Sequence, residues 1–154
     1  MMRSLLFFFS LFGLLNAKAQ SDLAKFGSPL EIPLFLSGNF AELRSNHFHT
    51  GIDIKTQGVE GQKVVAAESG VVSRISVSPY GYGLALYLEH PNGYTTVYGH
   101  LKEYDERIAK VVRERQYSTK AFRVDFKPSE EIFFEKGEVI ALSGNTGGSG
   151  GPHL

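Results

Sequence analysis

The side chains in this chain best suited to chemistry are histidines and one aspartate, spread over three segments. His49 and Asp53 stand four positions apart in the run His-Thr-Gly-Ile-Asp, and a neutral imidazole and a carboxylate are both good zinc ligands. On an extended strand the two would lie about 13 Å apart, too far to share one ion. A bend at Gly51 would bring them together. The spacing permits a metal pair, but it also permits an incidental pair on a surface turn, and His47 offers an alternative ligand.

His100 follows a predicted strand in the run Tyr-Gly-His-Leu. The period-two pattern of a strand predicts that His100 shares a polar and aromatic face with Tyr98, while Val97 and Leu101 face inward. A histidine at a strand end beside glycine can serve as a general base or a hydrogen-bond donor. It can equally be a plain exposed residue, and the local pattern leaves both interpretations open.

His153 follows a glycine-rich stretch at 144–152. Glycines let a backbone approach a ligand or bend sharply. The stretch lacks the Gly-Lys-Ser/Thr ending of a phosphate-binding loop, so a ligand-approaching loop and a flexible linker both remain open. His90 precedes a Pro-Asn-Gly turn, where a structural or solvent-exposed role is expected.

The elements that must position these residues are predicted to be mainly β. Short alternating or β-branched runs bounded by turn residues are typical of antiparallel strands, and they occur at 63–67, 71–76, 84–89, 94–98, 121–126 and 138–142. One helix is predicted over 103–116, because Tyr104, Ile108, Val111 and Val112 fall on one helical face.

Composition bounds the protein further. The chain has 154 residues, no cysteine and a formal net charge of zero. That length suits one domain, the lack of a basic surplus argues against nucleic-acid binding, and without disulfides the core or a metal must hold the fold.

Residues 1–19 have the three parts of a secretory signal: Arg3, a mostly apolar run at 5–15, and Ala17-Lys18-Ala19. The apolar run is shorter than the roughly 20 residues of a membrane-spanning helix. We therefore expect a secreted or periplasmic protein of the cell envelope, with no membrane span after signal removal.

Four blocks of sequence together resemble the lysostaphin-type (LytM-like) zinc metallopeptidases that cut peptidoglycan. They are the run at 49–53, the stretch at 65–72, the run at 98–101, and the stretch from 144 to His153-Leu154. The resemblance covers about residues 37–154. It implies an antiparallel β-sheet, barrel-like metallopeptidase fold of the duplicated hybrid motif type, with one inserted helix.

The resemblance also implies roles for individual residues. His49 and Asp53 would be Zn²⁺ ligands, which decides between His49 and His47, and His100 and His153 would be catalytic. The third zinc ligand of the family would fall one residue beyond Leu154. We therefore expect an incomplete peptidase domain at 37–154, preceded by a lead-in at 20–36, and little or no activity from the chain as it stands.

The expected function is hydrolysis of peptide cross-links in bacterial peptidoglycan. A catalytically inactive relative that binds peptidoglycan or activates another hydrolase is the alternative. A biotinyl or lipoyl carrier is disfavoured, because no lysine stands at the predicted hairpin tip Glu68-Ser69-Gly70. The segment 103–127 is interpreted as an insertion that walls the substrate groove or binds a partner. The sequence leaves the cleaved bond and the oligomeric state open.

Overall fold

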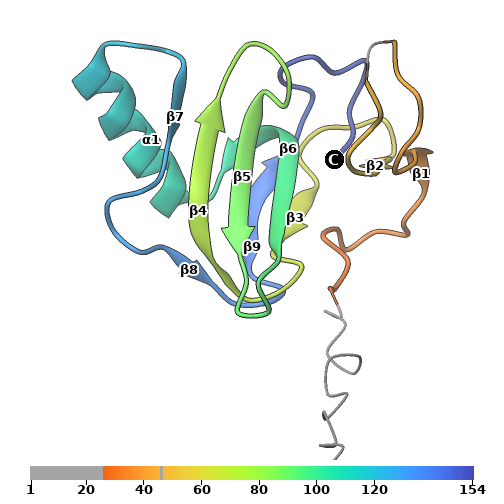
Figure 1. Cartoon of the computed structure of the whole chain (residues 1–154), viewed down its shortest axis with the longest axis horizontal. Coiled ribbons are helices and arrows are strands. Elements are labelled where there is room, and N and C mark those ends of the chain that lie inside the picture. Colours follow the sequence, from red (N-terminus) through yellow and green to blue (C-terminus); the bar gives the residue numbers. More distant parts are fainter. Residues whose placement is uncertain (1–25, 46) are drawn as a thin grey trace, which may run out of the picture.

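The computed structural model describes residues 26–45 and 47–154 (Figure 1). The predicted signal segment at 1–19 lies outside these residues. The described elements are β1 (Leu36–Gly38), β2 (Asp53–Ile54), β3 (Lys63–Val65), β4 (Gly70–Val77), β5 (Leu84–Glu89), β6 (Thr95–Tyr104), α1 (Glu106–Thr119), β7 (Val124–Phe126), β8 (Phe133–Phe134) and β9 (Val139–Ser143). The predicted mainly β fold with one helix is confirmed.

One antiparallel sheet forms the body of the molecule. Its strands lie in the order β3-β9-β6-β5-β4-β7, and β8 also pairs with β4. A separate two-stranded sheet of β1 and β2 lies at the other side of Figure 1 from α1. The pairing of β6 with β9 joins Leu101 to Ser143, so the glycine-rich stretch that follows β9 emerges beside Leu101, next to His100 and three residues before β6 ends.

The core lies against the inner face of this sheet. Alternation in β5 buries Leu86 and Leu88 completely, and Ile75 of β4 and Ile140 of β9 are also fully buried. Each such aliphatic side chain contributes about 1.5–3 kcal/mol by leaving water. The sheet is therefore a rigid support for loops at its edge.

Helix α1 covers one part of the sheet with a single apolar stripe. Ile108 and Val112 are its buried residues, one turn apart. The helix begins three residues later than predicted, because Tyr104 still belongs to β6 and the Asp105 side chain caps the first turn by accepting from the Arg107 N–H at 3.0 Å. It ends at Thr119, where Lys120 adopts the left-handed conformation.

Figure 1 separates α1 from β2 and the C-terminus along the longest axis of the molecule. The helix therefore lies away from the region that holds His49 and Asp53. The interpretation of the 103–127 segment as a groove wall or a partner-binding insertion stays a prediction. Within the described residues, the helix is too short and too polar to cross a membrane.

Candidate metal centre

His49 and Asp53 meet in the structure. The imidazole Nε2 lies 3.1 Å from Asp53 Oδ1, although the two residues are four apart. The chain from His49 to Ile52 is a loop that bends at Gly51, and Asp53 is the first residue of β2. This bend, the alternative to an extended strand, brings the two side chains together.

A short irregular hairpin holds His49 in position. Its backbone N–H donates to the Glu42 carbonyl oxygen, and its own carbonyl oxygen accepts from the Ala41 N–H, both at 2.8 Å. Farther along, the Arg44 N–H donates to the His47 carbonyl oxygen. His47 is exposed on this hairpin, whereas His49 faces Asp53.

The other polar atoms of the two side chains, His49 Nδ1 and Asp53 Oδ2, also have hydrogen-bonding partners. Arg44 Nη2 donates to Asp53 Oδ2 at 2.7 Å. His49 Nδ1 lies 3.0 Å from the Asn39 carbonyl oxygen and 3.2 Å from Arg44 Nη2. With its proton on Nδ1, the ring donates to the Asn39 carbonyl oxygen and keeps the Nε2 lone pair, which is the form a metal ligand needs. With its proton on Nε2, the ring donates to Asp53 and Nδ1 accepts from Arg44.

Gly38 makes this arrangement possible, and sequence reasoning missed both Gly38 and Arg44. Gly38 pairs with Asp53 across β1 and β2, and a methyl group at Gly38 would overlap the Asp53 carboxylate and the Arg44 guanidinium. Neither residue has a spacing to His49 or Asp53 that signals a contact. The arginine could have been suspected only as a cation close in sequence to a carboxylate.

His100 faces the site because β6 is irregular at this point. Tyr98 pairs with Leu86 and Leu101 pairs with Leu84, so β6 carries one more residue than β5 between these pairs. His100 has a φ of 54°, the left-handed region that histidine adopts more readily than bulkier residues. The extra residue is a β-bulge, and it turns the His100 side chain away from the core.

The bulge also corrects the predicted faces of β6. Tyr98 and Leu101 are both buried, at 3% and 0% exposure, whereas Val97 is 46% exposed. The period-two expectation that Val97 faces inward and that His100 shares a face with Tyr98 is therefore wrong, because an inserted residue shifts the alternation.

His153 lies next to His100. Their ring centroids are 4.6 Å apart, and His153 Nε2 lies 3.7 Å from Asp53 Oδ1. The backbone explains the approach, because Leu154 exchanges two hydrogen bonds with Ile54, at 2.7 and 3.0 Å. The end of the glycine-rich stretch is thus laid beside β2.

Both of these histidines are tied to backbone carbonyls through Nδ1. His100 Nδ1 is 2.8 Å from the Thr146 carbonyl oxygen, and His153 Nδ1 is 2.7 Å from that of Gly151. Donation from Nδ1 leaves each Nε2 free to accept a proton. Burial lowers the pKa of His100 below its ordinary value, against the opposing effect of the hydrogen bond to Thr146.

His90 is not part of this site. It is 3% exposed, with Nδ1 2.9 Å from the Ser69 carbonyl oxygen and Nε2 2.8 Å from Thr96 Oγ1. Both ring nitrogens are satisfied, so its role is structural.

The donor set near His49 fits part of a metal site. Among residues 26–45 and 47–154, no three histidine, cysteine, aspartate or glutamate side chains are arranged to hold one ion. Two donors, His49 Nε2 and Asp53 Oδ1, are aligned with their outer atoms hydrogen-bonded, as in metal sites with an ordered second layer.

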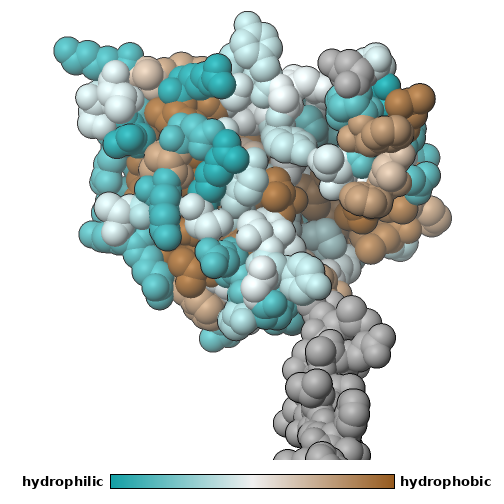
Figure 2. Space-filling model, in the orientation of Figure 1, coloured by the Kyte–Doolittle hydropathy of each residue, from teal (hydrophilic) through white to brown (hydrophobic). Residues whose placement is uncertain are grey.

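Apolar side chains gather on the surface around these residues. Figure 2 shows brown residues over the β1 and β2 region. Phe35, Phe40, Leu43 and Phe48 are 66%, 71%, 73% and 64% exposed, an unusual concentration for one small surface.

The antiparallel sheet, together with two histidines facing a histidine–aspartate pair, defines a metallopeptidase-like domain. The model of peptidase family M23 matches residues 47–121, a range that contains His49, Asp53 and His100. The chain belongs to peptidase family M23.

Individual proteins similar to this chain are also named as peptidases. The chain is 33% identical over 106 residues to a protein of Haemophilus influenzae named an uncharacterized metalloprotease, over 69% of this chain and 17% of that protein. It is 31% identical over 112 residues to the DD-carboxypeptidase/endopeptidase Mpg of Neisseria meningitidis, over 73% of this chain and 20% of that protein. The chain thus spans about a fifth of the length of the curated relatives it matches.

A solved structure shows the same fold. The catalytic domain of a mutant of the prophage-encoded M23 protein EnpA from Enterococcus faecalis superimposes with a TM-score of 0.58 at 19% identity, over 83% of this chain and 82% of that one. The predicted antiparallel metallopeptidase fold is confirmed at this level.

Proposed function

We propose that this domain belongs to an exported, zinc-dependent endopeptidase that hydrolyses peptide cross-links of bacterial peptidoglycan. The observation that carries the proposal is the convergence of His49 and Asp53 with His100 and His153, which come from three separate segments of the chain. The similarity to a protein named DD-carboxypeptidase/endopeptidase supports the substrate class, and the signal-like residues 1–19 support export.

His49 Nε2 and Asp53 Oδ1 would hold the zinc ion. Leu154 pairs with Ile54 and His153 with Lys55 in antiparallel register. The same register continued by one residue would set position 155 opposite Asp53, which supports the expected third ligand there. Residues directly opposite on paired strands have neighbouring side chains on one face. A histidine at that position would supply a third zinc-binding side chain beside His49 and Asp53.

When bound, zinc polarises the scissile carbonyl and lowers the pKa of a water molecule towards about 7. The Nε2 atoms of His100 and His153 would accept the proton of the attacking water. Once protonated, the same nitrogens can donate hydrogen bonds to the developing oxyanion. The hydrogen bonds of both Nδ1 atoms to backbone carbonyls fix the ring orientations that these steps require.

The exposed apolar side chains of Phe35, Phe40 and Phe48 lie in the segment that carries His49. They offer the wall against which the apolar parts of a peptide substrate would pack.

Zinc content and wall hydrolysis test the proposal on the protein made from its own gene. We expect about one zinc per chain and release of cross-link fragments from isolated cell walls. A product that purifies without zinc and releases no fragments contradicts the proposal.

A second candidate is an inactive relative that binds peptidoglycan or activates another hydrolase. The observation in its favour is the exposed apolar surface of Phe35, Phe40, Leu43 and Phe48, which suits binding without cleavage. Binding to isolated walls by a zinc-free gene product, without fragment release, would select this candidate.

A further inference from the structure

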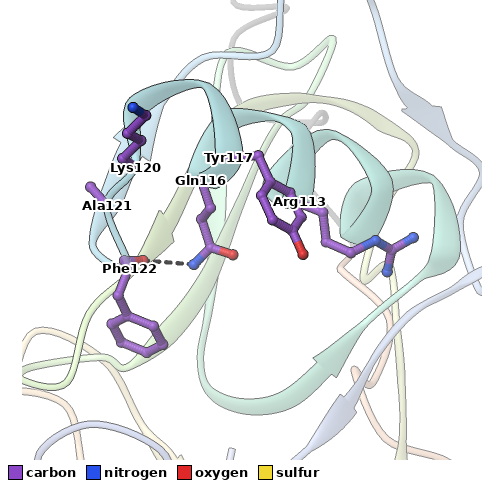
Figure 3. Close-up of a pocket in the computed structure, with 6 residues that line it drawn as sticks. All are labelled: Arg113, Gln116, Tyr117, Lys120, Ala121 and Phe122. Atoms are coloured by element: carbon purple, nitrogen blue, oxygen red, sulfur yellow. Dashed lines mark hydrogen bonds between the residues drawn. The ribbon is translucent and has the colours of Figure 1, made fainter.

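Helix α1 ends beside an open hollow of about 310 Å³. Figure 3 shows its lining, which comes from the last turns of the helix and from the chain that returns past them: Arg113, Gln116, Tyr117, Lys120, Ala121 and Phe122. In Figure 1 this end of the molecule lies far from β2 and the C-terminus. The hollow is therefore separate from the candidate metal centre.

Local backbone structure builds the hollow. Lys120 has a φ of 52°, and its N–H donates to the carbonyl oxygens of Gln116 and Tyr117, which ends the helix and reverses the chain. Gln116 Nε2 then donates to the Phe122 carbonyl oxygen at 2.6 Å. This bond fixes the returning segment against the helix (Figure 3).

Two aromatic rings at the hollow are open to solvent. Tyr117 is 83% exposed and Phe122 is 66% exposed, so the Tyr117 ring contributes little to the core of this domain. Large exposed aromatic side chains beside a concave surface are typical of binding sites.

Positive charge gathers at the same end of the molecule. Residues 106–127 contain seven basic and three acidic side chains, although the whole chain has no net charge. Some of these groups are paired, as Arg107 is with Asp105 and Glu138. Within the part of the chain that the structure describes, Arg113 and Lys120 form no ion pair. The two cations at the hollow are thus available to an anionic ligand.

We propose that this hollow binds the acidic glycan–peptide strands of peptidoglycan, as a docking site separate from the centre that cuts them. This inference rests on the proposed function for its choice of polymer. Arginine and lysine pair with the free carboxylates of stem peptides, and exposed aromatic rings pack against the flat apolar faces of sugars. Binding to a membrane surface needs a broad apolar face. A concave site with two aromatic rings is better suited to a polymer strand.

Docking at this hollow would tether the domain to its substrate. A second contact on the same polymer raises the effective concentration of the cleaved peptide at the metal centre. The hollow would therefore favour cleavage of the intact wall over cleavage of small soluble fragments.

Co-sedimentation of the full chain with purified sacculi tests this docking. A chelator is kept in the buffer, so that binding is measured without cleavage. We expect the double variant Arg113→Gln/Lys120→Gln to weaken binding about tenfold at low salt. We expect Tyr117→Ser/Phe122→Ser to weaken it at low and high salt alike, because stacking is not screened. The matched control Lys63→Gln/Lys102→Gln removes two exposed charges elsewhere and should stay within twofold of the parent.

The outcomes separate docking from catalysis. Sacculus binding that both hollow variants leave unchanged overturns the inference, as does binding that the control weakens equally. Tighter binding to phosphatidylglycerol vesicles than to sacculi, lost in the same variants, would assign the hollow to membranes and also overturn it. Docking that behaves as expected, in a gene product that releases no fragments, would instead overturn the proposed catalytic function alone.

Discussion

At the residue scale, the contact between Gly38 and Asp53 sets the geometry of the candidate metal pair. Arg44 occupies Asp53 Oδ2 and leaves Oδ1 facing His49, and only a residue without a side chain fits at position 38. Gly38→Ala should therefore displace the carboxylate and weaken zinc binding about 10–100-fold, the usual effect of disturbing residues that orient metal ligands. Competition with a chromophoric chelator measures the affinity on the gene product.

Gly150→Ala is the matched control for that substitution. A methyl group there meets no atom within 4 Å, so zinc affinity should stay unchanged. Equal affinities for the Gly38 variant and the parent would show that Asp53 does not depend on this close approach.

His100 offers a second test at the same scale. Asparagine tolerates the left-handed backbone at this position, so His100→Asn should keep the fold while removing the free Nε2. In the gene product, we expect turnover to fall about 10²–10⁴-fold, with zinc content unchanged. Loss of the metal in this variant would mean that His100 is a ligand and that the proposed division of roles is wrong.

Residue types single out the histidines and Asp53 as candidates, the family resemblance alone assigns them roles, and the rest of the site depends on contacts that no spacing encodes. The His49 and Asp53 pair and the separate interest of His100 and His153 follow from sequence. Arg44 and Gly38 could not be found in the same way. Their importance comes from the pairing of β1 with β2, and these strands are too short to leave a periodic pattern.

At the scale of elements, alternation predicted β4 and β5 but only the first part of β6, up to the bulge at His100. β4 and β5 fall where the β-branched and alternating runs lie, because one face of each strand packs on the core. The extra residue near His100 in β6 puts Tyr98 and Leu101, three positions apart, on the same buried face. Counting back from Leu101 by twos therefore assigns Val97 to the wrong face. A bulge is set by the partner strand, so one strand read alone does not reveal it.

Helix α1 supports the sheet without contributing to the candidate metal centre. Ile108 is fully buried, and Ile108→Ala should lower the free energy of unfolding by about 2–5 kcal/mol. The exposed Lys110→Ala should change it by less than about 0.5 kcal/mol. Urea unfolding measures both values, and zinc affinity measured in parallel should be unaffected. A loss of zinc affinity in folded Ile108→Ala protein would show that the helix and the site are coupled.

At the scale of the whole molecule, strand order assembles the site. β6 delivers His100, and its neighbour β9 leads into the stretch that ends at His153. That stretch then pairs with β2, which begins at Asp53. The four side chains come from distant parts of the sequence, so they meet only when the sheet has formed. In the absence of metal, unfolding of the sheet should therefore separate them.

The same assembly makes stability depend on pH through His100. Burial lowers its pKa in the folded protein below the ordinary value of 6.5. The unfolded chain therefore binds a proton at a higher pH than the folded chain does, and stability falls as pH is lowered below about 6.5. Above that pH both states are neutral at His100, and its contribution stays constant.

Denaturant midpoints recorded between pH 8 and 5 in a chelating buffer measure this dependence. His100→Asn removes the titrating ring, so the fall in stability between about pH 7 and 5.5 should become shallower in that variant than in the parent. The carboxylate of Asp125, whose pKa is lowered chiefly by its hydrogen bonds to Arg74, stays ionised across this window and should not contribute. Identical slopes in the variant and the parent would show that the proton taken up on acid unfolding goes elsewhere.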